Sequence, residues 1–210
     1  MSPGVRRPLY VEARLRAGLD EVWTRTQDPV QHVRWDLRFT RITPTGQASA
    51  GHETFEYALD LPGHRVHRRT LRGTGTSVGE HRRADGTRTS ALRFACPDRL
   101  SLLRRGAGYW RYVPAADGVR FLTGYDYEPG WGRAGRAVDA VVFRPMLGWM
   151  TAWSFDRLRL WVERGQPPEV STRRALVDAG LRAVACGPAA LAMVPAVRSR
   201  LSGPVRAGLV

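Results

Sequence analysis

The sequence predicts an α+β fold in which a curved antiparallel sheet packs against a long helix that follows it in the chain. Three observations support this fold class. Apolar residues alternate with polar ones over residues 9–15, turn signals recur at hairpin spacing from 37 to 128, and one long helical pattern follows from 133 to 164. A run of strands without intervening helices favours separate sheet and helix layers.

The first strand is predicted over residues 9–15, and it ends at Ala17-Gly18. Two short helices should follow. The first begins near Asp20, whose carboxylate suits a helix N-terminus, and the second begins at Asp28-Pro29 and carries Trp35. Neither helix is long enough to be stable alone, so both are expected to pack on the sheet.

We expect a sheet of about seven strands, because turn-forming dipeptides punctuate the middle of the chain. The spans predicted after the first strand are 37–43, 52–60, 65–73, 77–83, 87–95, 99–113 and 118–128. Gly73-Thr74-Gly75 is predicted to form a hairpin turn, and the pair Gly106 and Gly108 is predicted to break the 99–113 strand.

One long helix is predicted from 133 to 164, with a kink at Pro145. Apolar residues at helical spacing define the face expected to cover the sheet, namely Val138, Val142, Met146, Trp149 and Trp153. The sequence 166–168, Gln-Pro-Pro, is typical of a linker. We therefore expect one domain over 1–165 and a helical extension rich in Pro, Arg and Ala over 166–210.

The chain is strongly basic: its 33 basic residues, all arginine, against 19 acidic ones give a formal net charge of +14. The arginines are scattered over nearly every element and no nucleic-acid motif is present, which disfavours a nucleic-acid partner. An anionic membrane surface is a better electrostatic partner, because the extension combines arginines with apolar residues. Packing of the extension on the long helix, or a homodimer contact, is the alternative.

Catalytic and metal-binding signatures are missing from the sequence. The cysteines Cys96 and Cys186 lie far apart, and the five histidines include no HExxH motif, so we expect no metal. No P-loop and no GxGxxG before a helix is present, so no cofactor is expected. The N-terminus lacks the apolar core of a signal peptide and 183–197 is too short to span a bilayer. These features predict a cytoplasmic protein, with a peripheral position at the membrane left open.

Several segments together resemble the START-like superfamily, also called SRPBCC. They are Val11-Glu12-Ala13, Asp20-Glu21-Val22-Trp23, Asp28-Pro29 and Arg34-Trp35-Asp36 near the start, and the strand 118–128 followed by the long helix to Gly165. The resemblance covers about residues 1–165. It implies the helix-grip fold, with a ligand cavity between the sheet and the long helix. The superfamily contains polyketide cyclases and dehydrases, lipid-transfer proteins and plant pollen allergens.

Alternation along the strands indicates which side chains would line such a cavity. They are Phe55 and Tyr57, then Tyr109 and Arg111, then Phe121 and Tyr125, with Trp35, Met146, Trp149 and Trp153 from the helices. The alternative for each of them is an ordinary core position.

The strand predicted at 65–73 is expected to direct an arginine inward in either register, and Arg68 is the candidate. A buried arginine needs an oxygen partner. That partner is either a carboxylate of Glu53, Glu56 or Glu80, or an acidic or polyoxygenated ligand.

Three functions remain open at the level of sequence. The first is binding of a hydrophobic or amphipathic small molecule, such as a lipid or a polyketide. The second is a polyketide cyclase/aromatase-type enzyme, with Tyr57, Tyr125 and Arg68 as weak candidates for acid–base assistance. The third is a peripheral membrane or interaction module that acts through the basic extension.

Overall fold

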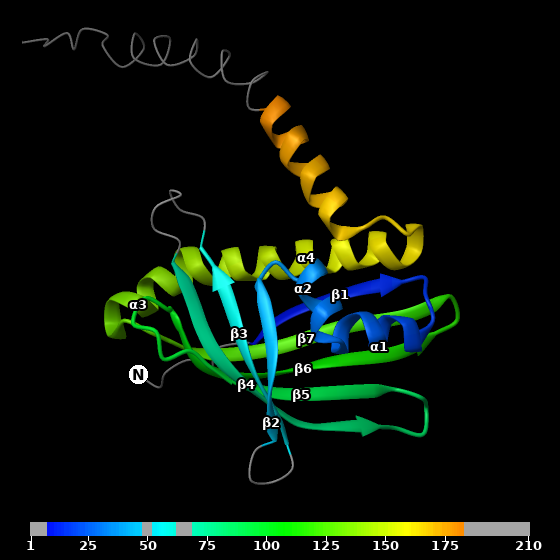
Figure 1. Cartoon of the computed structure of the whole chain (residues 1–210), viewed down its shortest axis with the longest axis horizontal. Coiled ribbons are helices and arrows are strands. Elements are labelled where there is room, and N and C mark those ends of the chain that lie inside the picture. The colour runs from blue at the N-terminus through cyan, green and yellow to red at the C-terminus, as the bar shows by residue number, and fades with distance from the viewer. Residues whose placement is uncertain (1–7, 48–51, 62–68, 183–210) are drawn as a thin grey trace, which may run out of the picture. The chain divides into compact units, whose positions relative to one another are not determined.

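A computed structural model describes residues 8–47, 52–61 and 69–182 of the chain. The chain divides into two compact units, Met1–Glu169 and Val170–Val210. The elements of the first unit are β1 (Leu9–Leu15), α1 (Leu19–Gln27), α2 (Pro29–Trp35), β2 (Arg41–Gln47), β3 (Glu53–Asp60), β4 (Thr70–Arg82), β5 (Arg88–Ala95), β6 (Leu103–Ala115), β7 (Gly118–Pro129), α3 (Gly132–Val138), the π-helical turn η1 (Asp139–Phe143) and α4 (Arg144–Arg164) (Figure 1).

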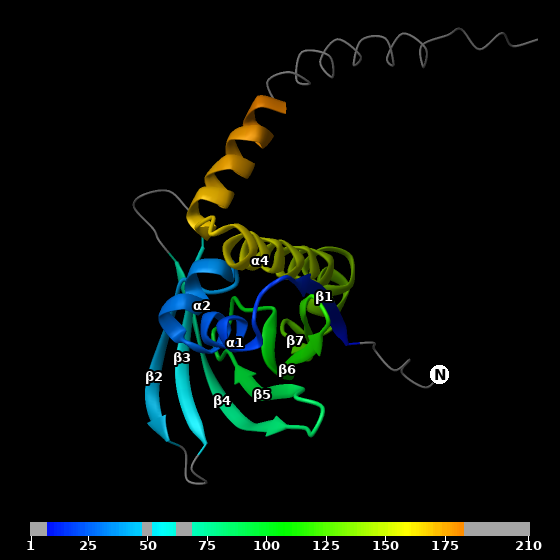
Figure 2. The ribbon, with the colours of Figure 1, turned by 90° about the vertical axis from the view of Figure 1, so that its right-hand side faces the viewer.

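The seven strands form one antiparallel sheet in the order β1-β7-β6-β5-β4-β3-β2. The first strand therefore pairs with the last, with Leu9 opposite Tyr125 and Leu15 opposite Val119. Figure 2 shows the sheet curling, with α4 over its β1–β7 side and α1 and α2 inside the curl at one end. The predicted α+β, helix-grip architecture is confirmed.

The two short helices begin close to the predicted residues. Pro29 occupies the first turn of α2, and the Asp28 side chain accepts a hydrogen bond of 2.9 Å from the Val30 amide. The first turn of α1 carries Asp20 and Glu21, whose charge suits the positive end of the helix dipole.

The prediction of a turn at Gly73-Thr74-Gly75 is wrong, because these residues lie inside the single long strand β4. These two glycines allow aromatic rings of the neighbouring strand to lie directly over β4. A Cβ built on Gly75 would lie 2.1 Å from the Phe55 ring, and one on Gly73 would lie 2.2 Å from the Tyr57 ring. The same holds in β6, which continues through Gly106 and Gly108. These glycines leave room for aromatic rings that cross the sheet surface.

The predicted helix is present from 132 to 164, but it contains the π-helical turn η1 just before Pro145 and it presents a different face to the sheet. Its buried side chains are Leu147, Thr151, Ser154, Phe155, Arg157, Leu158 and Trp161. The predicted face is exposed at Val138, Val142, Met146 and Trp149. The hydroxyls of Thr151 and Ser154 bond to their own helix backbone, at Leu147 and Met150, which allows them to be buried.

The core fills the space between the sheet and α4 in two clusters. The larger contains Leu15, Val22, Trp35, Trp110, Tyr112, Val119, Phe121, Phe155, Leu158 and Trp161. The smaller contains Tyr125, Tyr127 and Leu147, with Leu9, Phe94, Leu103 and Phe143 packed against it. Burial of so many aromatic rings is the main source of stability of this unit.

The second unit is described only as far as residue 182. Its described residues are helical and belong to a helical segment that spans 168–182. Leu176, Val177 and Leu181 are exposed on it, and Arg182 pairs with Asp178 at 2.8 Å. The rest of the predicted basic extension, and Cys186, lie outside the described residues. Within the described ranges, we find no helix with the length and apolarity needed to cross a membrane.

Candidate functional site

The register of the sheet defines which side chains lie on its concave face. Directly opposed residues of antiparallel strands share a face. Tyr57 lies opposite Gly73, Gly75 opposite Phe94, and Phe94 opposite Gly106. This row continues to Tyr127 through Gly106, and Tyr127 belongs to the smaller core cluster beneath α4. Phe55, Tyr57 and Phe94 therefore lie on the concave face.

The two sides of the concave face differ in burial: its β6–β7 half is fully covered, whereas its β3–β5 half is only partly covered. On β6 and β7, Trp110, Tyr112 and Phe121 are buried beneath α4 and the two short helices. On β3 and β5, in contrast, Phe55, Tyr57 and Phe94 are only partly buried. The second half therefore presents aromatic surface that the described residues do not fully cover.

A charged centre lies where the two halves meet. Asp36 is fully buried at the end of α2, and it accepts two hydrogen bonds from Arg38, at 2.9 Å from Nε and 2.6 Å from Nη2. His32 Nε2 lies 3.1 Å from the same carboxylate, and its Nδ1 lies 2.6 Å from the Thr26 carbonyl oxygen. We refer to His32, Asp36 and Arg38 as the Arg38 centre.

Helix α4 fixes the segment that carries this centre. The Arg157 guanidinium is buried and donates hydrogen bonds to the carbonyls of Arg34, at 2.7 Å, and Trp35, at 2.9 Å. One turn earlier, Ser154 Oγ accepts a 2.9 Å hydrogen bond from the Leu37 amide. The chain at 34–37 is therefore held at both ends, which sets the direction of the Arg38 side chain.

The charges of the centre are strongly coupled. Burial by itself would raise the pKa of Asp36, but the charge and hydrogen bonds of Arg38, with help from His32, hold that pKa well below the usual carboxyl range. Burial would likewise lower the pKa of Arg38, and the Asp36 carboxylate raises it above its ordinary value. Both groups therefore remain charged inside the protein over the physiological range.

Aromatic rings surround the Arg38 cation. Its Cζ lies 5.3 Å from the centre of the Trp110 ring, 5.4 Å from that of Tyr125 and 5.6 Å from that of Phe39. Phe39 in turn packs edge-on against Tyr57 with ring centres 5.5 Å apart. A cation that is 12% exposed thus borders the half-buried aromatic surface. Such an arrangement can hold a molecule with an apolar body and an oxygen-bearing end.

The two predicted tyrosines are hydrogen-bonded. Tyr57 donates from its hydroxyl to the Ala95 carbonyl oxygen at 3.2 Å, and burial raises the pKa of this phenol above its usual value. The Tyr125 hydroxyl lies 2.8 Å from Thr151 Oγ1 of α4. The Tyr57 phenol therefore stays protonated near neutral pH, which suits a hydrogen-bonding or proton-donating role and not that of a general base.

The structure brings some of the predicted residues together and separates others. Phe55, Tyr57 and Tyr125 lie on the concave face, and Trp35 and Phe121 lie fully buried in its core. The expectation that Tyr109 and Arg111 face the same cavity is wrong, because they pair with Gly124 and Leu122 on the opposite face of the sheet. Trp110 and Tyr112 take the inward positions.

Two of the three residues of the long helix predicted for the wall do not form it, and the third, Trp153, is half-buried. Met146 and Trp149 are exposed, and Trp153 packs against Trp149 with ring centres 5.1 Å apart. Arg68, the predicted inward arginine, lies outside the described residues. Its neighbour on the described part of the strand, Arg72, is exposed and pairs with Ala58, on the face opposite Tyr57.

Within the described residues, the arginine that borders the half-buried aromatic surface is Arg38, which the sequence analysis did not single out. A signal was present in the segment 35–39, where Asp36 and Arg38 alternate with Trp35, Leu37 and Phe39. This alternation places Asp36 and Arg38 on one side of the chain, where they can pair, but it does not show that this side is buried.

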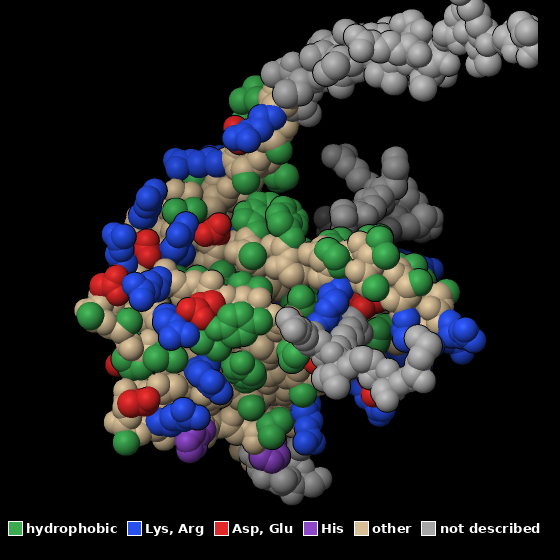
Figure 3. All heavy atoms as spheres, turned by 180° about the vertical axis from the view of Figure 1, so that it is seen from behind, with side chains coloured by type: hydrophobic (Ala, Val, Ile, Leu, Met, Phe, Trp, Pro, Cys, Tyr) green, Lys and Arg blue, Asp and Glu red, His purple; other side chains and the backbone are tan. Residues whose placement is uncertain are grey.

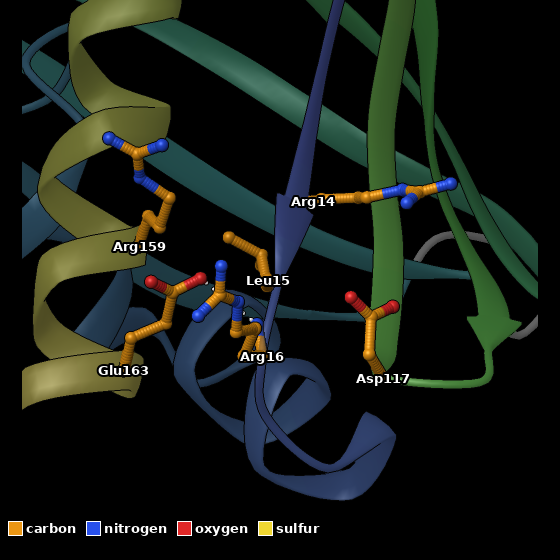
Figure 4. Close-up of a pocket in the computed structure, with 6 residues that line it drawn as sticks. All are labelled: Arg14, Leu15, Arg16, Asp117, Arg159 and Glu163. Carbon is orange, nitrogen blue, oxygen red and sulfur yellow. Dashed lines mark hydrogen bonds between the residues drawn. The ribbon is translucent and has the colours of Figure 1, made fainter.

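A separate hollow of about 230 Å³ lies outside this face, between β1, the β6–β7 turn and α4 (Figure 4). It is lined by Arg14, Leu15, Arg16, Asp117, Arg159 and Glu163. The Arg16 amide donates a 3.0 Å hydrogen bond to Glu163 within it. Its lining is almost entirely charged, so it does not suit an apolar ligand.

Comparison with known proteins adds one clear sequence relative. No family model matches the chain. The protein called "Uncharacterized membrane protein YndG" from Bacillus subtilis is 41% identical over 174 residues, which cover 82% of this chain and 63% of that protein. The chain thus spans less than two thirds of the length of this relative.

Solved structures share the fold at low sequence identity. TTHA0849 from Thermus thermophilus matches with a TM-score of 0.53 and 15% identity, covering 74% of this chain and 96% of that one. The di-domain aromatase/cyclase StfQ of the steffimycin biosynthetic pathway matches with a TM-score of 0.53 and 12% identity, covering 75% of this chain and 51% of its own. These likenesses concern the arrangement of the sheet and helices.

Proposed function

The chain has the fold of the START-like, or SRPBCC, superfamily, and on that premise we propose that its concave face binds a hydrophobic or amphipathic small molecule. The observation that carries the proposal is the position of Arg38 at the edge of a half-buried aromatic surface. Phe39, Phe55, Tyr57 and Phe94 supply the apolar contacts. Arg38 supplies hydrogen bonds to a carboxylate, phosphate or carbonyl oxygen.

The pairing with Asp36 leaves Arg38 suited to this role. A guanidinium has five N–H donors, and the carboxylate of Asp36 engages the edge formed by Nε and Nη2. Asp36 also compensates the buried charge before any ligand arrives, which lowers the cost of keeping the site ready. A lipid-like or polyketide-like molecule with one polar end fits this division between charge and apolar wall.

The relative's name places that protein at a membrane, a setting in which a lipid-like ligand would be available. For this chain the prediction remains a cytoplasmic location, with a peripheral position at the membrane left open.

Catalysis of the aromatase/cyclase kind is a second proposal, supported by the name of StfQ, by the Tyr125 ring beside Arg38 and by Tyr57, which packs on Phe39. In that case Arg38 would polarise a carbonyl oxygen of a folded substrate, and Tyr57 would turn its hydroxyl proton from the Ala95 carbonyl to the substrate. Tyr57→Phe should then abolish turnover of an aromatic polyketide precursor without changing the melting temperature. Unchanged products would exclude this role for Tyr57.

Binding is tested with a dansylated long-chain fatty acid as the probe, and with its methyl ester as the uncharged counterpart. We expect the acid to bind more tightly than the ester by about tenfold or more, because Arg38 gains a charged hydrogen bond only with the acid. Removing both partners in Asp36→Asn/Arg38→Gln should erase that preference while leaving binding of the ester.

The matched control is Arg105→Gln/Glu128→Gln. Arg105 and Glu128 form the same two-bond pair, at 2.9 Å in each bond, on the exposed surface of β6 and β7. This variant should bind the acid and the ester as the wild type does. If the wild type binds neither probe, or if the Asp36/Arg38 variant keeps the preference for the acid, the proposed site is wrong.

A further inference from the structure

The outer side of the long helix carries an uninterrupted apolar surface. Between residues 137 and 152, every exposed side chain is apolar, and we call this set the outer helix strip: Ala137, Val138, Ala140, Val141, Val142, Pro145, Met146, Trp149 and Ala152. Val141 is 76% exposed and Trp149 is 60% exposed. Soluble domains rarely keep a continuous apolar surface of this length without a partner.

The polar residues of the same segment are turned inward. Asp139 is buried and accepts a hydrogen bond from the Tyr127 hydroxyl, while Arg144 reaches Asp126 at 3.5 Å. Thr151 is buried against Tyr125. The segment therefore directs its charged and hydroxyl groups toward the sheet, and the indole N–H of Trp149 is the one strong hydrogen-bond donor among its exposed side chains. In Figure 3, hydrophobic side chains follow the long helix along this side.

Positive charge lies next to the strip. Arg133 and Arg136 are exposed in α3, immediately before its first residue. The whole chain carries a formal net charge of +14. Trp149 also belongs to the residue type that is most favoured at the level of lipid headgroups.

We propose that the outer helix strip docks on the surface of an anionic lipid bilayer, with its apolar side chains entering the headgroup region and Arg133 and Arg136 contacting lipid phosphates. A helix with an apolar outer side and basic residues at one end suits this position. A protein partner is a poorer fit, because protein interfaces contain about one hydrogen bond per 100–200 Å² and the exposed side chains of the strip offer one strong donor, the indole N–H of Trp149.

The test is co-sedimentation of the full chain with vesicles of phosphatidylcholine alone and of phosphatidylcholine with phosphatidylglycerol. We expect binding to the anionic vesicles, weakened in high salt. Val141→Asp should reduce the partition coefficient about tenfold or more, because a carboxylate would enter the headgroup region. Trp149→Ala, which adds no charge, should reduce it several-fold.

The matched control is Val30→Asp, since Val30 is 75% exposed on α2, outside the strip. It should bind vesicles as the wild type does and should melt at the same temperature as Val141→Asp. The proposal is overturned if the wild type ignores anionic vesicles, or if Val141→Asp binds them equally well, as it would if the extension carried binding. It is also overturned if the wild type is a dimer that Val141→Asp dissociates, with no vesicle binding.

This surface is independent of the interior site, which lies on the other side of α4. The Asp36→Asn/Arg38→Gln variant should therefore sediment with anionic vesicles as the wild type does. A failure of the interior site and a failure of the docking surface are thus distinguished by separate variants.

Discussion

At the scale of single residues, Asp36 and Arg38 form a buried ion pair on the concave side of the sheet. Each charge is buried only because the other compensates it, and Arg38 donates both hydrogen bonds to the Asp36 carboxylate, at 2.9 Å and 2.6 Å. Removing one partner leaves a buried charge alone, whereas removing both leaves polar groups of similar shape. For this reason the double variant, and not either single one, is the informative probe of ligand binding.

The stability of the protein should depend on this pair in a pH-dependent way. The folded state lowers the pKa of Asp36, so the contribution of Asp36 to folding is present above the ordinary carboxyl pKa of about 4 and is lost as the pH falls below it. The difference in unfolding free energy between the wild type and Asp36→Asn/Arg38→Gln should therefore shift against the wild type on acidification.

Urea unfolding of both proteins from neutral pH to below the carboxyl range measures this shift. A difference that stays constant throughout would mean that the Asp36 carboxylate titrates as an ordinary exposed group. Arg105→Gln/Glu128→Gln serves as the reference for loss of an exposed pair, whose contribution to stability should be small.

The sequence could have revealed the residue type needed inside the fold but not its position. The predicted inward arginine, Arg68, lies outside the described residues, and the structure places another arginine inside the fold, Arg38 on the segment after α2. The position of Arg38 depends on Arg157 and Ser154 of α4, more than a hundred residues later in the chain. Local patterns contain no information about such distant anchors.

At the scale of elements, the glycines of the long strands are packing residues. Gly108 faces Tyr125, and a Cβ built on Gly108 would lie 2.6 Å from the Tyr125 Cβ. Gly108→Ala should therefore destabilise the protein by about 1–3 kcal/mol through overpacking.

Gly148→Ala in α4 is the control for this prediction. A Cβ built on Gly148 would lie 3.4 Å from Leu9, an ordinary contact distance. Alanine stabilises the interior of a helix by about 1 kcal/mol relative to glycine, so Gly148→Ala should not destabilise the protein. Thermal and urea unfolding of both variants measures the contrast. Equal stability of Gly108→Ala and the wild type would show that the strands adjust freely at this position.

The orientation of α4 leads to a second prediction at this scale. Phe155 is buried and stacks on Phe121 with ring centres 4.6 Å apart, whereas Trp149 is largely exposed. Phe155→Ala should cost about 3–5 kcal/mol of stability, and Trp149→Ala should change it by less than about 0.5 kcal/mol. A larger loss of stability for Trp149→Ala than for Phe155→Ala would show that the helix face predicted from the sequence is the one that packs on the sheet.

Two ambiguities explain why the sequence misplaced these faces. The long helix has two apolar stripes, and the one on the sheet contains Thr151 and Ser154, which weaken its apolar pattern. On β6, aromatic residues occupy both alternating positions, Tyr109 as well as Trp110 and Tyr112. The order and type of the elements were predictable from periodicity. When a strand carries aromatic residues on both of its faces, however, alternation alone cannot show which face is buried.

At the scale of the whole molecule, the sheet, the short helices and α4 form one compact body with two distinct surfaces. The inner surface combines aromatic rings with the Arg38 centre, and the outer helix strip is apolar throughout its exposed positions. A ligand carried inside and a bilayer contacted outside would place this protein between a membrane and a lipid-like molecule.

The most direct test of the central proposal is photo-crosslinking with a fatty acid that carries a diazirine near its carboxyl end, followed by peptide mapping. We expect labelling of the concave face, in peptides that contain Phe39, Tyr57 or Phe94, and competition by unlabelled fatty acid. Labelling confined to Val141–Trp149, or labelling that the unlabelled acid does not reduce, would contradict binding inside the fold.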